Sequence, residues 1–239
     1  MGVVYNPKIV TDGLVLCLDA ANVKSYPGTG TTWFDLSGRA GTNFTINASA
    51  YNGSGPKYMD FGGSYGCATT SNNADTTFSG NITAVVWTRI LNSTSNWRTL
   101  FRAETSGSDH QVIIQSGGWL IGMYDNVNVS GFNSTGFSQQ SLPGYASNQW
   151  NMLVWRWADI QGEFNYHTLT YNDSPEVVRG TMTSVNTRFK TGFRTLGAYN
   201  SSSPSQFWGD IAHLSMYNRR LTDNEIKTMF YSQRGRFGI

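Results

Sequence analysis

The chain has 239 residues, enough for one large β domain, and a formal net charge of only +2. Charged residues make up 13% of it, about half the usual share, whereas glycine (26 residues) and aromatic residues (14%) are abundant. This balance argues against a helical protein and against the basic face of a nucleic-acid-binding protein, and it predicts many short strands joined by polar turns.

The N-terminal residues MGVVYNPKIVTDG have no basic stretch leading into an apolar core, so we expect no secretory signal. Nothing approaches the roughly 18 consecutive apolar residues of a membrane span. Cys17 and Cys67 are too far apart for a CxxC metal pair, and both lie in strand-like sequence. We therefore predict two buried free thiols, with a disulfide between them as the alternative.

Alternation of apolar residues with a period of two predicts strands through most of the chain. In GLVLCLDA (13–20), Leu14, Leu16 and Leu18 are expected on one face. In NITAVVWTRI (81–90), the alternation places Val86 and Trp87 on opposite faces.

The pattern continues to the end of the chain. HQVIIQSGGWLIGMYD (110–125) breaks at Gly117-Gly118 and predicts a hairpin. WNMLVWRWAD (150–159) and three later segments (164–173, 193–199 and 210–217) also alternate. About a dozen strands result, separated by loop-like regions at 20–57, 63–80, 125–148 and 198–207, and they favour a single sandwich or jelly-roll domain over residues 1–239.

The sequence ends in its one clear helix. Thr222 and Glu225 have the spacing of a capping box, and Leu221 and Ile226 that of a hydrophobic staple. The helix is expected over Asp223–Gln233, with Gly235 as its stop.

Ile226, Met229 and Phe230 form one apolar stripe on that helix. A helix this short is marginal alone, so the stripe is expected to pack on the preceding sheet. The densest basic region flanks the helix, where we interpret it as structural. Its members are Arg219, Arg220, Lys227, Arg234 and Arg236.

Both ends of the chain carry a family resemblance. WGDIAHLSMYNRRLTDNEI (208–226) resembles the last strand and following helix of the concanavalin A-like lectin/glucanase superfamily, in its laminin-G-like branch. DGLVLCLDAANVKSYPGTGTTWFDLSG (12–38) resembles the opening of such domains in marine phage and bacterial proteins, and RGRFGI resembles the terminus of phage-encoded versions. The resemblance implies an all-β fold, an antiparallel β-sandwich jelly roll whose first and last strands are neighbours, with one short C-terminal helix on an edge or face.

Glucanases of this superfamily carry a strand-borne run such as E-x-D-x-x-E, which this chain lacks. Its nearest imitation, Asp159 and Glu163, falls in a predicted turn. His110, His167 and His213 are scattered, without Ser, Cys or Asp at the spacing of a known motif. We therefore predict that the chain is not an enzyme and has no catalytic residues.

Many relatives bind Ca²⁺ through acidic side chains. This chain has Phe61-Gly62-Gly63 where Phe-Asp-Gly is expected, and Ile211-Ala212-His213 where Ile-Asp-Glu is common. Asp60 and Asp210 lie near these places but out of register. No cofactor and no metal ligands are predicted, and a Ca²⁺ site near these two residues is kept as an alternative.

Exposed aromatic rings that stack on sugars are the remaining candidates for a site. Trp97, Trp119 and Tyr145 lie in or beside turn-rich sequence and are predicted ligand-binding residues, with hairpin packing or a protein interface as the alternatives. Trp87, Trp155 and Trp157 lie inside alternating strands and are expected in the core.

Three functions remain. The first is a non-enzymatic virion structural protein, a capsid decoration or fibre-like module made in the host cytoplasm. Its partners would be other virion proteins, host-surface glycans or further copies of itself, with no role for nucleic acid or membrane. The second is a carbohydrate-binding module for adsorption, and the third is a relative of the glycan hydrolases.

Overall fold

The computed structural model describes most of the chain in separate ranges. These are residues 9–39, 42–46, 50–62, 68–69, 81–90, 97–102, 110–115, 120–125, 140–141, 148–158, 165–174, 177–182, 195–197 and 209–239.

Sixteen strands and two C-terminal helical segments lie in these ranges. They are β1 (Leu14–Asp19), β2 (Thr32–Trp33), β3 (Phe44–Thr45), β4 (Tyr51–Asn52), β5 (Tyr58–Asp60), β6 (Ala68–Thr69), β7 (Asn81–Ile90), β8 (Trp97–Arg102), β9 (His110–Gln115), β10 (Leu120–Asp125), β11 (Gln140–Ser141), β12 (Trp150–Ala158), β13 (Asn165–Tyr171), β14 (Val177–Met182), β15 (Thr195–Leu196), β16 (Gly209–Tyr217), the helix α1 (Asp223–Gln233) and the 3₁₀ helix η2 (Arg234–Phe237).

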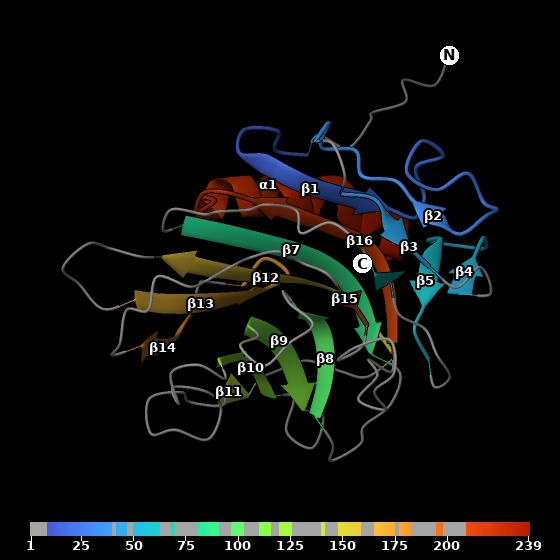
Figure 1. The fold of residues 1–239 in the computed structure, drawn as a ribbon. Helices are drawn as coiled ribbons and strands as arrows, with labels where there is room; N and C mark the ends of the chain where they lie inside the picture. The colour runs from blue at the N-terminus through green and yellow to red at the C-terminus, as the bar shows by residue number, and fades with distance from the viewer. Residues whose placement is uncertain are drawn as a thin grey trace.

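The strands form two antiparallel sheets (Figure 1). The first sheet has the order β14-β13-β12-β7-β16-β5-β4, and β1 also pairs with β16, so the first and last strands are neighbours. The second sheet has the order β11-β10-β9-β8-β15-β6-β3-β2. These findings confirm the expected all-β, antiparallel architecture and the hairpin of β9 and β10.

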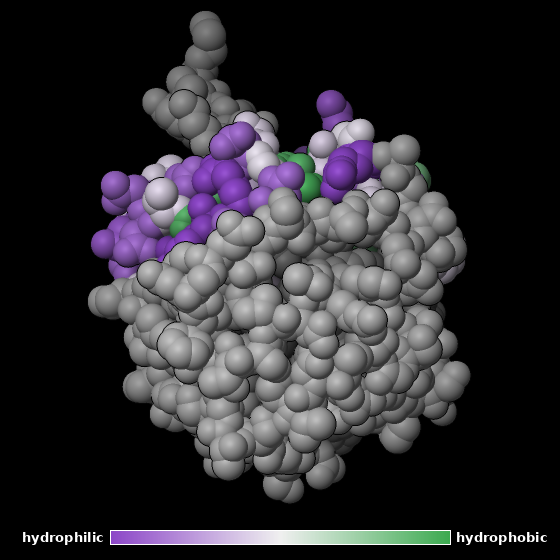
Figure 2. All heavy atoms as spheres, turned by 60° about the vertical axis from the view of Figure 1, so that its left-hand side comes forward, coloured by the Kyte–Doolittle hydropathy of each residue, from purple (hydrophilic) through white to green (hydrophobic). Residues whose placement is uncertain are grey.

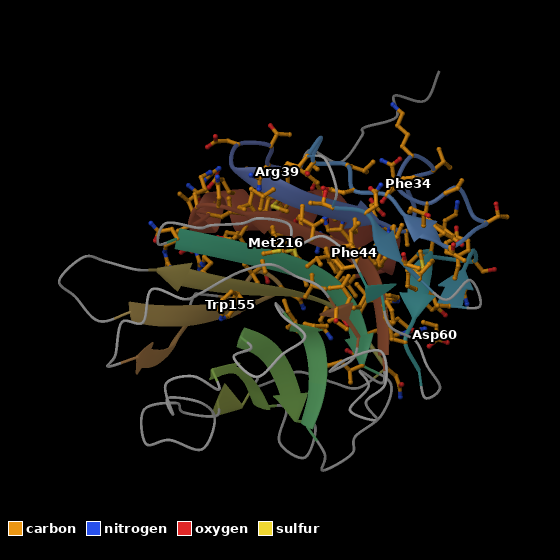
Figure 3. All side chains as sticks on the ribbon, viewed as in Figure 1. Phe34, Arg39, Phe44, Asp60, Trp155 and Met216 are labelled. Atoms are coloured by element: carbon orange, nitrogen blue, oxygen red, sulfur yellow. The ribbon has the colours of Figure 1, made fainter. Side chains whose placement is uncertain are left out.

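A large apolar core fills the space between the sheets. Val86, Trp155 and Met216 enter it from the first sheet, and Phe44 and Leu100 enter from the second. Trp155, Met216 and Phe44 are labelled in Figure 3. In β7, β12 and β16, alternate side chains enter this core and the intervening ones face the opposite side of the sheet, as the period-two alternation predicts.

The other face of the first sheet is covered by the C-terminal helix. Ile226, Met229 and Phe230 of α1 form a second apolar cluster with Trp87 and Met152 of the sheet. Figure 1 shows α1 running behind β1 and β16. The predicted stripe is therefore buried as expected. On the face that Figure 2 shows, the described residues are mostly hydrophilic. None of the helices in the described ranges has the length and apolar character needed to cross a membrane.

The helix begins where the capping box predicts. The Glu225 amide donates to the Thr222 hydroxyl at 3.3 Å, and the Thr222 amide donates to the Glu225 carboxylate at 2.8 Å. The helix spans Asp223–Gln233, as expected. Gly235 does not end the helical segment, however, because η2 continues through it. The C-cap in the left-handed conformation is instead Gly238, with φ of 74°.

Two further expectations are corrected. Leu14 does not share a face with Leu16 and Leu18, because a bulge between Leu14 and Leu16 turns Leu14 toward the helix side. The predicted loop at 20–57 contains the short strands β2, β3 and β4.

The described cysteine follows the prediction. Cys17 is buried and carries a free thiol. Cys67 lies outside the described residues.

Candidate functional site

A row of four side chains crosses the helix-side face of the first sheet. Trp150 on β12 lies opposite Arg89 on β7, Arg89 opposite Asp210 on β16, and Asp210 opposite Asp60 on β5. Directly opposed residues on paired strands project from the same face. We call these four residues the Arg89 row.

An ion pair lies at the centre of the Arg89 row. The Arg89 Nε and Nη2 atoms are 2.7 and 2.6 Å from Asp210 Oδ2. The Asp210 side chain is 1% exposed, whereas that of Arg89 is 27% exposed. The row therefore contains a buried carboxylate held beneath a guanidinium that reaches solvent.

Aromatic rings fix the position of this guanidinium. The Arg89 Cζ atom is 5.1 Å from the ring centroid of Tyr58 and 5.3 Å from that of Trp150. Both distances lie within the range of cation–π attraction. Tyr58 is itself anchored, because its hydroxyl accepts a hydrogen bond from Asn52 Nδ2 at 2.9 Å.

The two carboxylates of the row have different environments. Asp60 is exposed, and its Oδ1 accepts the Gly62 amide at 2.6 Å. Burial raises the pKa of Asp210 to about 6, against the lowering effect of Arg89, and the neighbouring charge of Asp60 adds to the rise. Asp210 Oδ1 is buried and has no hydrogen-bond partner among the described residues.

A second polar cluster joins the ends of the chain. Arg236 donates to Asp19 Oδ1 at 2.7 Å and to the carbonyls of Pro56 and Lys57 at 2.6 and 2.8 Å. His213 is buried, and its Nδ1 lies 3.8 Å from Asp19 Oδ2. Although burial opposes ionisation, His213 and Arg236 hold the pKa of Asp19 well below its ordinary value. We interpret this cluster as a structural lock, because Arg236 connects the end of the chain to Asp19 and to the carbonyls of Pro56 and Lys57.

The sequence itself decides the family. A profile described as the concanavalin A-like lectin/glucanases superfamily matches residues 61–227, more than half of the chain. The chain belongs to this superfamily. A sequence search of curated proteins found no match for this concanavalin A-like chain.

Solved structures share the fold at low sequence identity. A mutant of Trypanosoma rangeli sialidase displaying trans-sialidase activity is similar to this chain with a TM-score of 0.65 and 17% identity, over 95% of this chain and 34% of that one. The same sialidase in complex with sialic acid gives a TM-score of 0.63 and 15% identity, over 94% and 33% of the two chains.

A toxin domain is similar as well. The binding domain of botulinum neurotoxin DC, in complex with rat synaptotagmin II, has a TM-score of 0.60 and 16% identity, over 94% of this chain and 52% of that one. The chain thus spans about a third of the sialidases and about half of the toxin domain, and these likenesses show the fold alone.

The structure brings together only some of the residues singled out in the sequence. Trp97 lies in β8 with its side chain outside the description, and Trp119 and Tyr145 lie outside the described residues altogether. The acidic pair Asp159 and Glu163 also falls outside them. These predictions remain predictions.

The predicted core tryptophans are confirmed where they are described. Trp87 is fully buried and Trp155 is 4% exposed. Trp157 lies in β12, but its side chain is outside the description, as are those of His110 in β9 and His167 in β13.

Asp60 and Asp210, which lie near the positions where relatives carry calcium-binding acids, are opposite each other on β5 and β16, but they do not fit this ion. Ca²⁺ takes six to eight oxygen ligands, and Arg89 already occupies Asp210 Oδ2 with a positive charge. The described residues contain no group of three or more His, Cys, Asp or Glu side chains that could hold a metal.

The Arg89 row itself was not predicted. Asp60, Arg89, Trp150 and Asp210 are scattered over 150 residues of sequence, and only the register of three strand pairs aligns them. The sole hint was the pair of acids near the expected calcium motifs.

Proposed function

We propose that this concanavalin A-like chain is a non-enzymatic recognition module that serves as a structural component of a virus particle, as a capsid decoration or fibre-like module. In this role it would contact host-surface glycans. The observation that carries the non-enzymatic part is the state of the Asp60–Asp210 pair, whose inner carboxylate is buried and bound to Arg89.

A retaining glycosidase needs two carboxyl groups about 5–5.5 Å apart that both reach the scissile bond. Cross-strand neighbours such as Asp60 and Asp210 have a separation of this order, with Cβ atoms about 4.5–5.5 Å apart. Asp210 is nevertheless 1% exposed, and one of its oxygens is held by two nitrogen atoms of Arg89. It is poorly placed to protonate a leaving group or to attack a sugar, which favours binding over hydrolysis.

The structural neighbours support recognition as the role of the fold. One is a toxin domain in complex with rat synaptotagmin II, and another is a sialidase in complex with sialic acid. Those activities belong to those proteins, and because a fold alone does not assign a function, the toxin domain supports the binding role only by analogy.

The virion role is supported by the ends of the chain. The segments that resemble phage-type domains, 12–38 and 234–239, contain β1 and η2, and Arg236 next to Phe237 donates a hydrogen bond to Asp19 at the end of β1. As part of this proposal, the protein is located in the virion. It would contact other virion proteins there, with self-association as a further expectation.

Quantitative mass spectrometry of purified particles tests this role. We expect the protein at a copy number comparable to that of capsid proteins, and its absence from the particles would refute the structural assignment.

A glycan array tests the alternative of a free carbohydrate-binding module, with Trp97→Ala, Trp119→Ala and Tyr145→Ala as variants of the predicted aromatic contacts. Release of reducing sugar from β-glucans would instead support a hydrolase.

A further inference from the structure

The Arg89 row lies where the C-terminal cover of the sheet ends. Phe237 stacks on Trp87 with ring centroids 4.1 Å apart and contacts Trp150 at 5.0 Å. Beyond Trp150 the row continues to Arg89, which is 27% exposed, and to Asp60, which is exposed. Figure 3 shows Asp60 at the rim of the molecule on β5. Part of the row is therefore open to a ligand.

The charge of the row restricts the chemistry of that ligand. The single positive charge of Arg89 is paired with Asp210, so the negative charge of Asp60 is left over. An anionic ligand would meet this uncompensated carboxylate, and a bare cation would meet the guanidinium. A neutral ligand that both donates and accepts hydrogen bonds avoids the repulsion from Asp60 and the repulsion from Arg89.

The polar groups of the row are held in place before any ligand arrives. Arg89 is fixed by Asp210 and by the rings of Tyr58 and Trp150. A guanidinium has five N–H donors, more than Asp210 can use through one oxygen. Groups that are already ordered lose little entropy on binding.

The row also lacks a donor. Asp210 Oδ1 is a buried acceptor without a partner among the described residues, and a buried polar group left unpaired is costly. Asp60 is exposed and its Oδ1 already accepts the Gly62 amide, which leaves its Oδ2 as the acceptor for a ligand. A hydroxyl group is the neutral donor that suits the exposed carboxylate of Asp60.

We propose that the Arg89 row is a binding site for a neutral, hydroxyl-rich sugar. One hydroxyl of a vicinal pair donates to Asp60, and its neighbour accepts from Arg89. Asp210 is a positioning residue that holds Arg89. The site discriminates against acidic sugars such as sialic acid, because their carboxylate would lie beside Asp60. This inference rests on the proposed function, since it names one glycan-binding surface of the module.

The test is an NMR titration of the full chain labelled with ¹⁵N, using the methyl glycosides of glucose, galactose and mannose as neutral probes and N-acetylneuraminic acid as the acidic probe. At least one neutral glycoside is expected to shift the Trp150 indole and Arg89 Nε–H signals, and the acid is expected to leave them in place. Asp60→Asn should weaken binding about tenfold, as loss of a charged hydrogen-bond acceptor does.

Two further variants complete the design. Asp12→Asn, which removes another exposed carboxylate paired with an arginine (Arg219), should bind like the unaltered chain. Arg89→Gln combined with Asp210→Asn removes the ion pair without leaving a buried charge, and it should abolish the shift of the Trp150 indole signal while the fold is retained.

The outcomes separate the two proposals. If a neutral glycoside binds but Asp60→Asn and the double variant bind it equally well, the Arg89 row is not the site, and the recognition role stands. If no neutral glycoside binds, the inference is wrong even if the protein is found in particles. Binding of N-acetylneuraminic acid at the row would overturn the predicted selectivity.

Discussion

The indole of Trp87 on β7 and the ring of Phe237 in η2 stack almost parallel, with centroids 4.1 Å apart and an interplanar angle of 13°. Both side chains are buried, and they connect the centre of the first sheet to the last residues of the chain. The C-terminal segment thus completes the apolar layer on the outer face of the sheet, and its removal should expose that layer.

Phe237→Ala should lower the free energy of unfolding by about 3 kcal/mol, because it removes a buried aromatic ring and leaves a cavity over Trp87. Urea denaturation followed by tryptophan fluorescence measures the change. Ile239→Ala, at a position that is 44% exposed, is the control and should stay within about 0.5 kcal/mol. Equal stabilities for the two variants would show that the terminal segment does not seal the sheet.

Arg236→Ala should lower the free energy of unfolding by about 2 kcal/mol or more, because it leaves Asp19 and the carbonyls of Pro56 and Lys57 without their hydrogen-bond donor. Arg236→Lys keeps the charge but loses the planar fork, so an intermediate stability is expected. Arg234→Ala, two residues away and exposed, serves as the matched control in the same thermal melts. A loss no larger than that of the control would argue against the structural lock.

The raised pKa of Asp210 should make the stability of the protein fall as pH rises through the mildly acidic range. Its pKa is about 6 in the folded chain against an ordinary value of 3.8, so between these values the folded state binds more protons than the unfolded state. The free energy of unfolding should therefore fall as pH rises from about 4 to 6, by roughly 2–3 kcal/mol for this group alone. Urea titrations at a series of pH values measure the slope, and Asp210→Asn should flatten it.

Glu225 should make the stability of the protein rise with pH, opposite to the effect of Asp210, and it should do so at lower pH. Chiefly because Arg219 donates to it, its pKa is lowered to about 2 from 4.5, so its contribution is complete above pH 4.5 and is lost as pH falls toward 2. Glu225→Gln should leave the slope between pH 4.5 and 6 unchanged. If it removes that slope, the assignment to Asp210 is wrong.

Cys17 should be chemically inert in the folded protein. Burial raises the pKa of its thiol to about 12, with the carboxylates of Asp19 and Asp35 contributing, so almost no thiolate is present at neutral pH. In a Cys67→Ser background, Ellman's reagent should react with Cys17 only after denaturant is added. Rapid labelling of the native protein would contradict the burial of this thiol.

Local signals in the sequence predicted local structure well. The capping box of Thr222 and Glu225 and the stripe of Ile226, Met229 and Phe230 gave the correct helix bounds and the buried face, because both depend on residues within one or two turns. Alternation similarly identified the long strands and the buried Trp87 and Trp155.

Features that depend on register across strands could not be predicted in this way. The bulge between Leu14 and Leu16 shifts one residue to the opposite face, and alternation carries no mark of it. The Arg89 row requires three strand pairings that join residues 60, 89, 150 and 210. The contact of His213 with Asp19 also depends on register, because it joins opposite residues of β1 and β16.

We propose that the chain binds glycans and does not cleave them. The most direct test of this proposal is to capture neutral oligosaccharides on the immobilised protein, elute them after long incubation and determine their masses. We predict that bound oligosaccharides are recovered intact. Recovery of shortened products would contradict the account, because a binding module releases its ligand unaltered.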